Sequence, residues 1–174
     1  DFRPWGRYNR GDWEEVLNHI VHCADLHLSD AERDYGLTVL DELLGHAGRG
    51  DVDAVVFAGD VFDSWQDAEV LRAEFRKRVL PIAESKPVIL IAGNHERLGA
   101  GGQLDRLDLG CPVYEKRPFS LVRFSDTEFL ILPFRESYSD YLSWETPAPR
   151  AEGVRYRIAV AHGSLAGSGF SGTQ

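Results

Sequence analysis

Three short apolar runs, separated by two amphipathic segments, give the first half of the chain a regular alternation. The runs cover residues 20–24, 53–58 and 88–92, and each predicts a buried strand. Between them, residues 29–46 and 67–80 repeat apolar side chains at helical spacing. Strand, helix, strand, helix and strand at this pace predict parallel pairing with right-handed crossovers.

Local signals place the ends of the two helices. Ser29 and Glu32 form a capping box, so we expect the first helix to start there and to run to about His46. Pro81 is expected to end the second helix. The residues expected on the buried helix faces are Tyr35, Val39, Leu40, Leu43 and Leu44 in the first and Val70, Leu71, Phe75 and Val79 in the second.

The pattern changes in the second half of the chain. Residues 97–110 are rich in glycine and predict a loop with a helical turn. Residues 121–124 and 128–132 predict an antiparallel hairpin, and residues 157–161 predict a last strand. The sequence therefore starts as a parallel α/β unit and continues with antiparallel structure.

Composition indicates one globular domain, because 43% of the 174 residues are hydrophobic and 27% are charged. We assign residues 19–174 to this domain. Residues 1–18 mix aromatic and basic side chains, and we interpret them as an arm that covers part of the core; stacking on bases is the alternative. No methionine is present, so we treat the chain as a piece of a longer protein.

The cysteine content and the net charge limit which cellular compartment and which binding partners are expected. Cys23 and Cys111 suggest no disulfide framework, and no segment resembles a signal peptide or a membrane span, so we expect a cytoplasmic protein without a membrane partner. The net charge of -9 argues against a DNA-binding protein that relies on a basic patch. It argues less against an enzyme whose cations are metals.

Four predicted strands each end in side chains of the types that bind metals. In chain order these are Asp25 with His27, Asp60, Asn94 with His95, and His162. We expect Asp25 and His27, two residues apart, to point to the same side of an extended chain. Ligand sites in open α/β sheets lie outside the carboxyl ends of the strands, so these side chains should converge. Carboxylate, amide and imidazole together suit borderline divalent transition metals.

Each of these residues alone has a structural explanation. Asp60 alone fits a helix cap, Asn94 alone fits a turn, and His162 alone fits a hydrogen-bonded core histidine. The occurrence of all of them at successive strand ends favours a metal site.

The motifs Asp25-x-His27, Gly59-Asp60-x-x-Asp63, Gly93-Asn94-His95-Glu96 and His162-Gly163 resemble the first four motifs of the calcineurin-like metallophosphoesterases. The resemblance covers about residues 19–165. It implies an α/β fold, a metallophosphoesterase-type β-sandwich flanked by helices, with a parallel βαβαβ start, a later antiparallel hairpin and a C-terminal part missing from this chain. Residues 21–28, which include His22, and residues 59–63 are most similar to the SbcD-type DNA double-strand-break repair exonucleases.

The resemblance implies a site with two divalent transition metals, manganese first, with iron or zinc as alternatives. Asp25, His27 and Asp60 would hold the first metal. Asp60, Asn94 and His162 would hold the second, so that Asp60 bridges the two. A hydroxide between the metals would then attack a phosphodiester in line.

The resemblance also assigns roles beside the metals. His95 is similar to the family residue that protonates the leaving group or stabilises the transition state. Asp63 and Glu96 are candidates to orient His95 or the ligands; each also fits a solvated loop acid. The implied substrate is DNA and the implied partner is an SbcC-type coiled-coil ATPase subunit, with a homodimer left open.

Two other functions remain open at this point. The same site suits a phosphodiesterase or phosphatase acting on nucleotides, lipids or phosphoproteins, and a degenerate site suits a non-catalytic scaffold. The chain stops before the family's later Gly-His-x-His motif, which supplies two more ligands. We therefore expect weak metal binding, poor catalysis and self-association through apolar surface around Phe124, Phe129 and Ile131.

Overall fold

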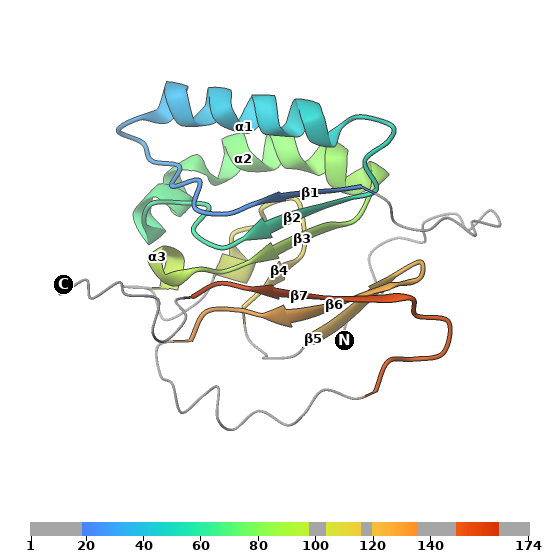
Figure 1. The fold of residues 1–174 in the computed structure, drawn as a ribbon. Helices are drawn as coiled ribbons and strands as arrows, with labels where there is room; N and C mark the ends of the chain where they lie inside the picture. Colours follow the sequence, from blue (N-terminus) through green and yellow to red (C-terminus); the bar gives the residue numbers. More distant parts are fainter. Residues whose placement is uncertain (1–18, 98–103, 116–119, 136–148, 164–174) are drawn as a thin grey trace, which may run out of the picture.

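A computed structural model describes residues 19–97, 104–115, 120–135 and 149–163. These residues form two β-sheets packed face to face and a helix layer on the outer face of the first sheet (Figure 1). The predicted arm over residues 1–18 lies outside the described residues. None of the described helices is long and apolar enough to cross a membrane.

The first sheet is parallel throughout and has the order β1-β2-β3-β4. Its strands are β1 (Ile20–Cys23), β2 (Ala54–Ala58), β3 (Val88–Ile91) and β4 (Val113–Tyr114). The predicted parallel start is confirmed. The sequence pattern missed β4, because a strand of two residues is too short to show a period.

Helices α1 (Arg33–Ala47) and α2 (Trp65–Ser85) cover one face of this sheet (Figure 1). Apolar side chains from the sheet and from both helices form the larger core cluster, in which the ring of Phe75 meets Phe57 edge-on and Phe62 at a tilt. The helices therefore bury the face of the sheet that points away from the second sheet.

The helix boundaries differ from the predicted ones. The N–H of Glu32 donates to Ser29 Oγ at 3.3 Å, so this pair closes a turn before α1, and Tyr35 is 72% exposed instead of buried. Pro81 lies inside α2, because the packing of residues such as Val79 holds the helix together across the missing N–H. Val70 is 52% exposed, so its predicted burial is wrong as well.

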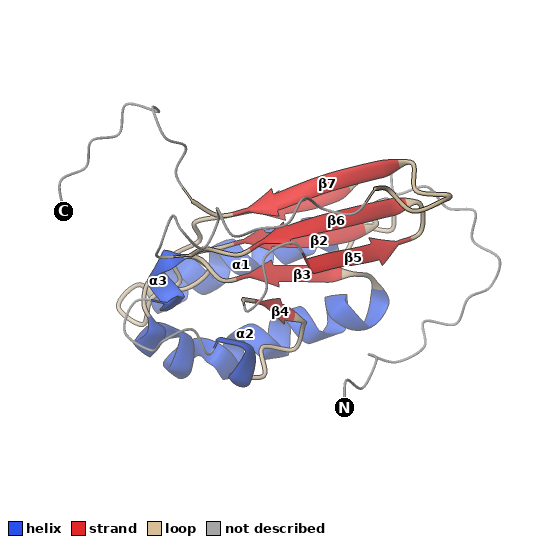
Figure 2. Cartoon of the chain, turned by 90° about the horizontal axis from the view of Figure 1, so that it is seen from below, coloured by secondary structure: helices blue, strands red, loops and turns tan. Residues whose placement is uncertain are grey.

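The second sheet has the order β5-β6-β7. Strands β5 (Ser120–Phe124) and β6 (Thr127–Leu132) form the predicted antiparallel hairpin, and β7 (Tyr156–Ala161) pairs with β6 in parallel. Figure 2 shows this sheet lying across β2 and β3, on the side away from the helices.

A second core cluster fills the space between the sheets, and the predicted sandwich flanked by helices is thus confirmed. Its buried members are Val56, Ala58, Ile89, Ile91, Phe129, Ile131 and Val160. The expectation that Phe129 and Ile131 are poorly covered is wrong, because both side chains are fully buried against the first sheet. Only Phe124 of the three expected residues is partly exposed.

Candidate metal centre

The carboxyl ends of β1, β2, β3 and β7 point to one end of the sandwich (Figure 1). Beyond these ends the chain bends sharply, because Asp25, His27 and Asp60 take left-handed backbone conformations, with φ of 54°, 47° and 49°. Such angles are uncommon for residues other than glycine and tend to occur at functional sites. Backbone hydrogen bonds hold the bend: the N–H groups of Asp25 and His27 donate to the carbonyls of Gly59 and Asp60.

The polar side chains at these ends form two groups that share one residue. Asp25, Asp60 and His162 make the first group, and His27, Asp60 and His95 make the second. Within each group the potential ligand atoms all lie within 4.8 Å of one another. The left-handed backbone therefore places Asp25 and His27 in different groups that share Asp60, whereas an extended strand would place them side by side.

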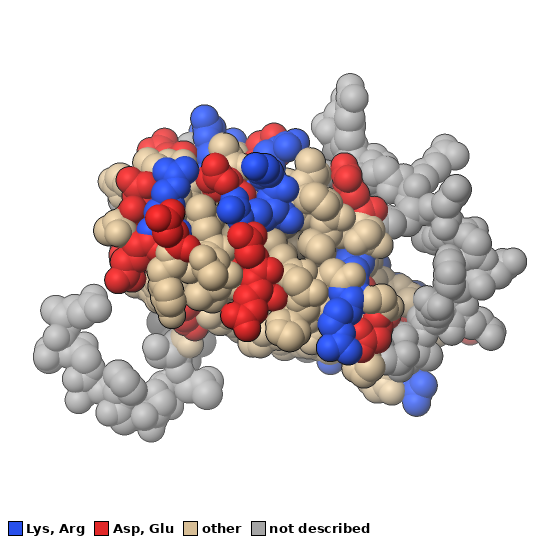
Figure 3. Space-filling view, turned by 90° about the horizontal axis from the view of Figure 1, so that it is seen from above, with Lys and Arg blue, Asp and Glu red and all other residues tan. Residues whose placement is uncertain are grey.

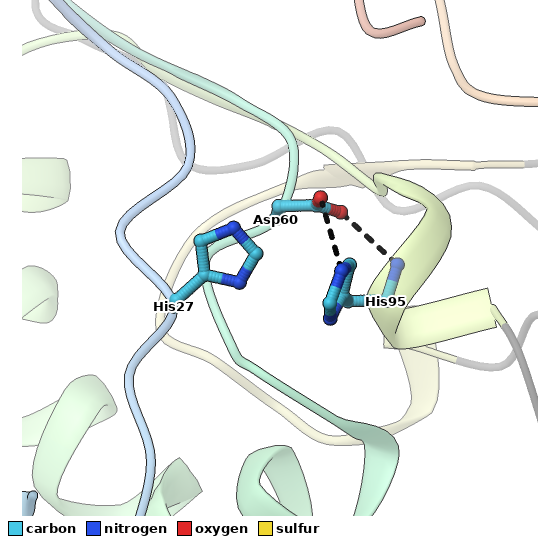
Figure 4. Close-up of side chains that lie close together, drawn as sticks. All are labelled: His27, Asp60 and His95. Carbon is cyan, nitrogen blue, oxygen red and sulfur yellow. Dashed lines mark hydrogen bonds and ion pairs between the residues drawn. The ribbon is translucent and has the colours of Figure 1, made fainter. Parts of the chain in front are cut away.

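Figure 4 shows the second group, in which the ring of His27, from the loop after β1, and the ring of His95, from a short helix, lie beside Asp60. The ring centroids are 4.5 Å apart and meet edge-on. The backbone N–H of His95 donates to Asp60 Oδ1 at 3.0 Å, and its Nε2 lies 4.0 Å from Asp60 Oδ2. His95 comes from α3 (Asn94–Arg97), the short helix that follows β3.

His162, at the end of β7, contacts the first group and Asn94. Its Nδ1–H donates to the carbonyl of Ala58 at 2.8 Å, which leaves Nε2 facing the centre. That nitrogen is 3.3 Å from Asp60 Oδ2 and 3.1 Å from Asn94 Oδ1. The hydrogen bond with Asp60 raises the pKa of His162 to about 9, against the effect of burial. A cation bound here would replace that proton.

Asp60 is the buried acid at the middle of the centre, with 3% of its surface exposed. Burial alone would raise the pKa of Asp60, but hydrogen bonds from His162 and from the backbone of His95 hold it below its usual range. The carboxylate is therefore ionised at neutral pH and available to a cation.

Two further acids contact the loops of the centre. The carboxylate of Asp63 lies 3.1 Å from His27 Nδ1, and the carbonyl of Asp63 accepts the Nδ1–H of His95 at 2.6 Å. Glu96 is fully buried, and its two oxygens accept three backbone N–H groups from the loops after β2 and β3. The donors to Glu96 are Val61, Phe62 and Gly93.

Two glycines leave room for the side chains of the centre. Gly59 has φ of 95°, and a Cβ at this position would overlap the ring of His162. A Cβ on Gly93 would overlap the carboxylate of Asp60. Both positions require glycine because a ligand side chain from another strand end occupies the space of a side chain.

A cavity of about 350 Å³ opens at the centre. Its walls include Asp25, Asp60, Asn94 and His162 from the predicted site. They also include His22 and Phe134. Phe134 was missed by the sequence reasoning, and its only signal was an aromatic residue directly after the Pro133 that follows β6.

The donor types around the cavity fit divalent metal ions. One carboxylate, three imidazoles and one amide oxygen lie around the buried carboxylate of Asp60, a mixture typical of manganese, iron or zinc sites. Several of these donors are already fixed by hydrogen bonds from their other atoms, as metal ligands usually are.

Comparisons with known proteins identify relatives of the chain. A family model described as calcineurin-like phosphoesterase matches residues 19–173. The SbcD component of the nuclease SbcCD from Bacillus subtilis is 28% identical over 116 residues, which cover 63% of this chain and 28% of that protein. The DNA double-strand break repair protein Mre11 of Thermoplasma acidophilum is 30% identical over 167 residues, covering 83% of this chain and 43% of that protein.

Among solved structures, the nuclease MPE of Pseudomonas putida is similar at 24% identity, with a TM-score of 0.42, over 65% of this chain and 52% of that one. The chain spans less than half the length of the two curated relatives that it matches.

Proposed function

The chain belongs to the calcineurin-like phosphoesterase family, and from this membership we propose that it is the metal-dependent hydrolytic part of a DNA repair nuclease. The observation that carries the proposal is the position of Asp60, the one residue common to both groups of potential ligands. A carboxylate shared in this way suits a bridge between two cations. The two curated relatives, both named for nuclease or DNA-break repair functions, support the choice of substrate.

The proposed ligands are Asp25, His27 and Asp60 for one metal and Asp60, Asn94 and His162 for the other, with manganese as the first candidate. When bound, the two cations would neutralise charge on the phosphate oxygens and lower the pKa of a water molecule. In the structure Asp25 is grouped with His162 and His27 with His95, which differs from these sets, but Asp60 belongs to both groups, and this supports its role as the bridge.

His95 is the proposed proton donor to the leaving oxygen. Its Nδ1–H is held by the carbonyl of Asp63, so its Nε2 points toward the centre. Asp63 would thus orient His95, and Glu96 would hold the two loops that carry Asp60 and Asn94 at a fixed separation. Asp63 and Glu96 would position the reacting groups, and His95 would transfer the proton.

The proposal extends to the setting of the protein. By similarity to relatives named as a nuclease subunit and as a DNA double-strand break repair protein, it would act on DNA together with a partner subunit. The resemblance to the SbcD-type exonucleases implies that this partner is a coiled-coil ATPase. A cytoplasmic location is proposed because Cys23 and Cys111 are both free thiols. The second candidate is a phosphodiesterase or phosphatase that acts on nucleotides, lipids or phosphoproteins. The net charge of -9 favours it, because an acidic surface repels DNA.

Hydrolysis assays with manganese test the proposal. We expect the complete protein, which carries the later Gly-His-x-His ligands of the family, to cleave linear duplex DNA and a small diester such as bis(p-nitrophenyl) phosphate, and Asp60→Ala to lose both activities. Asp34→Ala, a change of an exposed acid in the first turn of α1, is the control and should keep them. Cleavage of the small diester without cleavage of any DNA would favour the second candidate, and no hydrolysis of either would refute both.

A further inference from the structure

A second, larger cavity of about 530 Å³ lies along the start of β7, beside the first residue of β1. We call it the arginine groove; its lining includes Arg150, Arg155, Arg157, Tyr156, Ile20 and Ile158. None of the described residues that line it is acidic. In a chain whose net charge is -9, three arginines around one cavity are a local reversal of charge.

Two of the three arginines have charges that remain available. Arg157 is paired with the buried Glu128, at 2.6 Å between Nη2 and Oε2. Arg150 donates to the carbonyl of Arg155 at 2.8 Å, a contact that fixes its position without neutralising it. Within the described part of the chain, no ion pair joins Arg150 or Arg155 to a carboxylate.

An aromatic ring lies beside these charges. The guanidinium of Arg155 sits 5.0 Å from the centre of the Tyr156 ring. In the register of the sheet, Tyr156 and Ile158 pair with Thr127 and Phe129, residues of the buried inner face, yet they are 40% and 36% exposed. A flat apolar surface next to free positive charge is the combination that binds a nucleotide base together with its phosphate.

The groove and the metal centre lie at opposite ends of the same two strands. β1 leads from Ile20 to Asp25, and β7 leads from Tyr156 to His162, both directed toward the metal centre (Figure 1). Six residues of strand span about 20 Å. A small phosphoester cannot reach both places, whereas a polymer with a phosphate on every unit can. The outer face of the helix layer offers no such site, because basic and acidic side chains are interspersed there (Figure 3).

We infer that the arginine groove binds a single-stranded segment of the nucleic acid whose phosphodiester is held at the metal centre. Arg150 and Arg155 would neutralise backbone phosphates, and Tyr156 would stack on an unpaired base. The inference rests on the proposed function and specifies its substrate as a strand several nucleotides long. A single strand is favoured over a duplex because only an unstacked base can lie flat on the ring.

Binding of a fluorescent oligothymidine of about 20 nucleotides, followed by anisotropy in EDTA, tests the groove without any contribution from metals. Arg150→Ala/Arg155→Ala should reduce the slope of log affinity against log salt by about 1.4, since each phosphate contact on a single strand contributes about 0.7. Tyr156→Ala should weaken binding about 5- to 100-fold with little change of slope, and Tyr156→Phe should keep the affinity.

The matched control is Arg72→Ala/Lys77→Ala, which removes two exposed positive charges from α2. It should leave affinity and slope unchanged, and melting curves show whether every variant is folded. Absence of binding by the unaltered chain, unaltered binding by the groove variants, or equal loss in the control would overturn the inference. A duplex bound as tightly, with the same sensitivity to Tyr156→Ala, would overturn the assignment to a single strand.

Hydrolysis of bis(p-nitrophenyl) phosphate by the complete protein with manganese separates the groove hypothesis from the proposed function. This small diester does not reach the groove, so the groove variants should hydrolyse it at the rate of the unaltered protein. Loss of groove-dependent binding with intact hydrolysis refutes the groove alone. Groove-dependent binding in a protein that hydrolyses no diester refutes the proposed function and leaves the groove as a binding site.

Discussion

Nε2 of His162 lies 3.3 Å from the carboxylate of Asp60, although the two residues follow strands that belong to different sheets. The contact exists only because β7 packs over β2 through the buried cluster between the sheets. The candidate metal centre is therefore assembled by the sandwich as a whole, and changes to ligands, to neighbouring glycines and to the sheet packing should all affect it.

Asp60→Ala should remove metal from both groups of ligands. Asp60 is common to both groups, and its buried charge would attract both cations. In the complete protein, the number of bound manganese ions, measured by calorimetry and by elemental analysis, should fall from two to none or one. Asp60→Asn, which keeps the shape and loses the charge, should show the same direction of change. An unchanged stoichiometry in both variants would exclude a bridging role for Asp60.

Gly93→Ala should weaken metal binding without touching a ligand. A methyl group at this position would overlap the carboxylate of Asp60, which has little freedom to move because it is buried. The control is Gly45→Ala in α1, where a Cβ meets nothing within 4 Å and the helix should gain about 0.5 to 1 kcal/mol. Manganese titration and thermal melting compare the two; normal metal binding by Gly93→Ala would show that Asp60 can shift.

His95→Ala should keep its metals and lose about 10²- to 10⁴-fold in turnover of a diester, the typical loss when a general acid is removed. The structure also offers an alternative, because His95 lies with His27 and Asp60 in one group of potential ligands. Metal content and turnover must be measured on the same preparation. Loss of a metal would make His95 a ligand, and unchanged turnover would remove it from the mechanism.

Much of the fold is predictable because its signals are local. Continuous apolar runs predict the buried strands β2 and β3, and the period-two segments predict the hairpin. The features that the sequence predicted wrongly depend on tertiary contacts. Pro81 stays helical because neighbouring residues pack, and Phe129 is covered by a sheet distant in the sequence. No local pattern reports either contact.

In the candidate site, too, some features have local sequence signals and others depend on the folded structure. Side chains of ligand type at strand ends predict which residues meet, since parallel strands end at one edge. How they meet depends on the left-handed backbone at Asp25 and His27, which an alternation rule for strands excludes. The predicted superfamily is confirmed by the match over residues 19–173, whereas metal retention, catalysis and self-association stay predictions.

A buried acid outside the set of proposed metal ligands, Glu115, should make folding stability depend on pH. Glu115 is 2% exposed and accepts the backbone N–H groups of Leu104 and Asp105, which belong to the 3₁₀ helix η1 (Leu104–Arg106). Burial, with a hydrogen bond to Asp105 and the charge of that acid, raises the pKa of Glu115 from 4.5 to about 7. The folded state therefore holds a proton that the unfolded state releases at lower pH.

The direction in which stability changes with pH follows from the difference in the pKa of Glu115 between the folded and the unfolded state. Because the pKa of Glu115 is higher in the folded state, its favourable contribution is complete below about pH 4.5 and is lost as the pH rises through 7. Between pH 5 and 8 the protein should lose up to about 3 kcal/mol of unfolding free energy through this group. Glu115→Gln stays neutral and can still accept the N–H of Leu104, so this part of the loss should disappear.

Urea unfolding at several pH values, compared between the unaltered protein and Glu115→Gln, isolates the contribution of this residue from that of all other titrating groups. Glu42→Gln on α1, an exposed position, provides the control and should follow the unaltered protein. If the two curves stay parallel from pH 5 to 8, Glu115 does not hold its proton in the folded state. If Glu115→Gln is less stable at every pH by a constant amount, its hydrogen bonds matter and its titration does not.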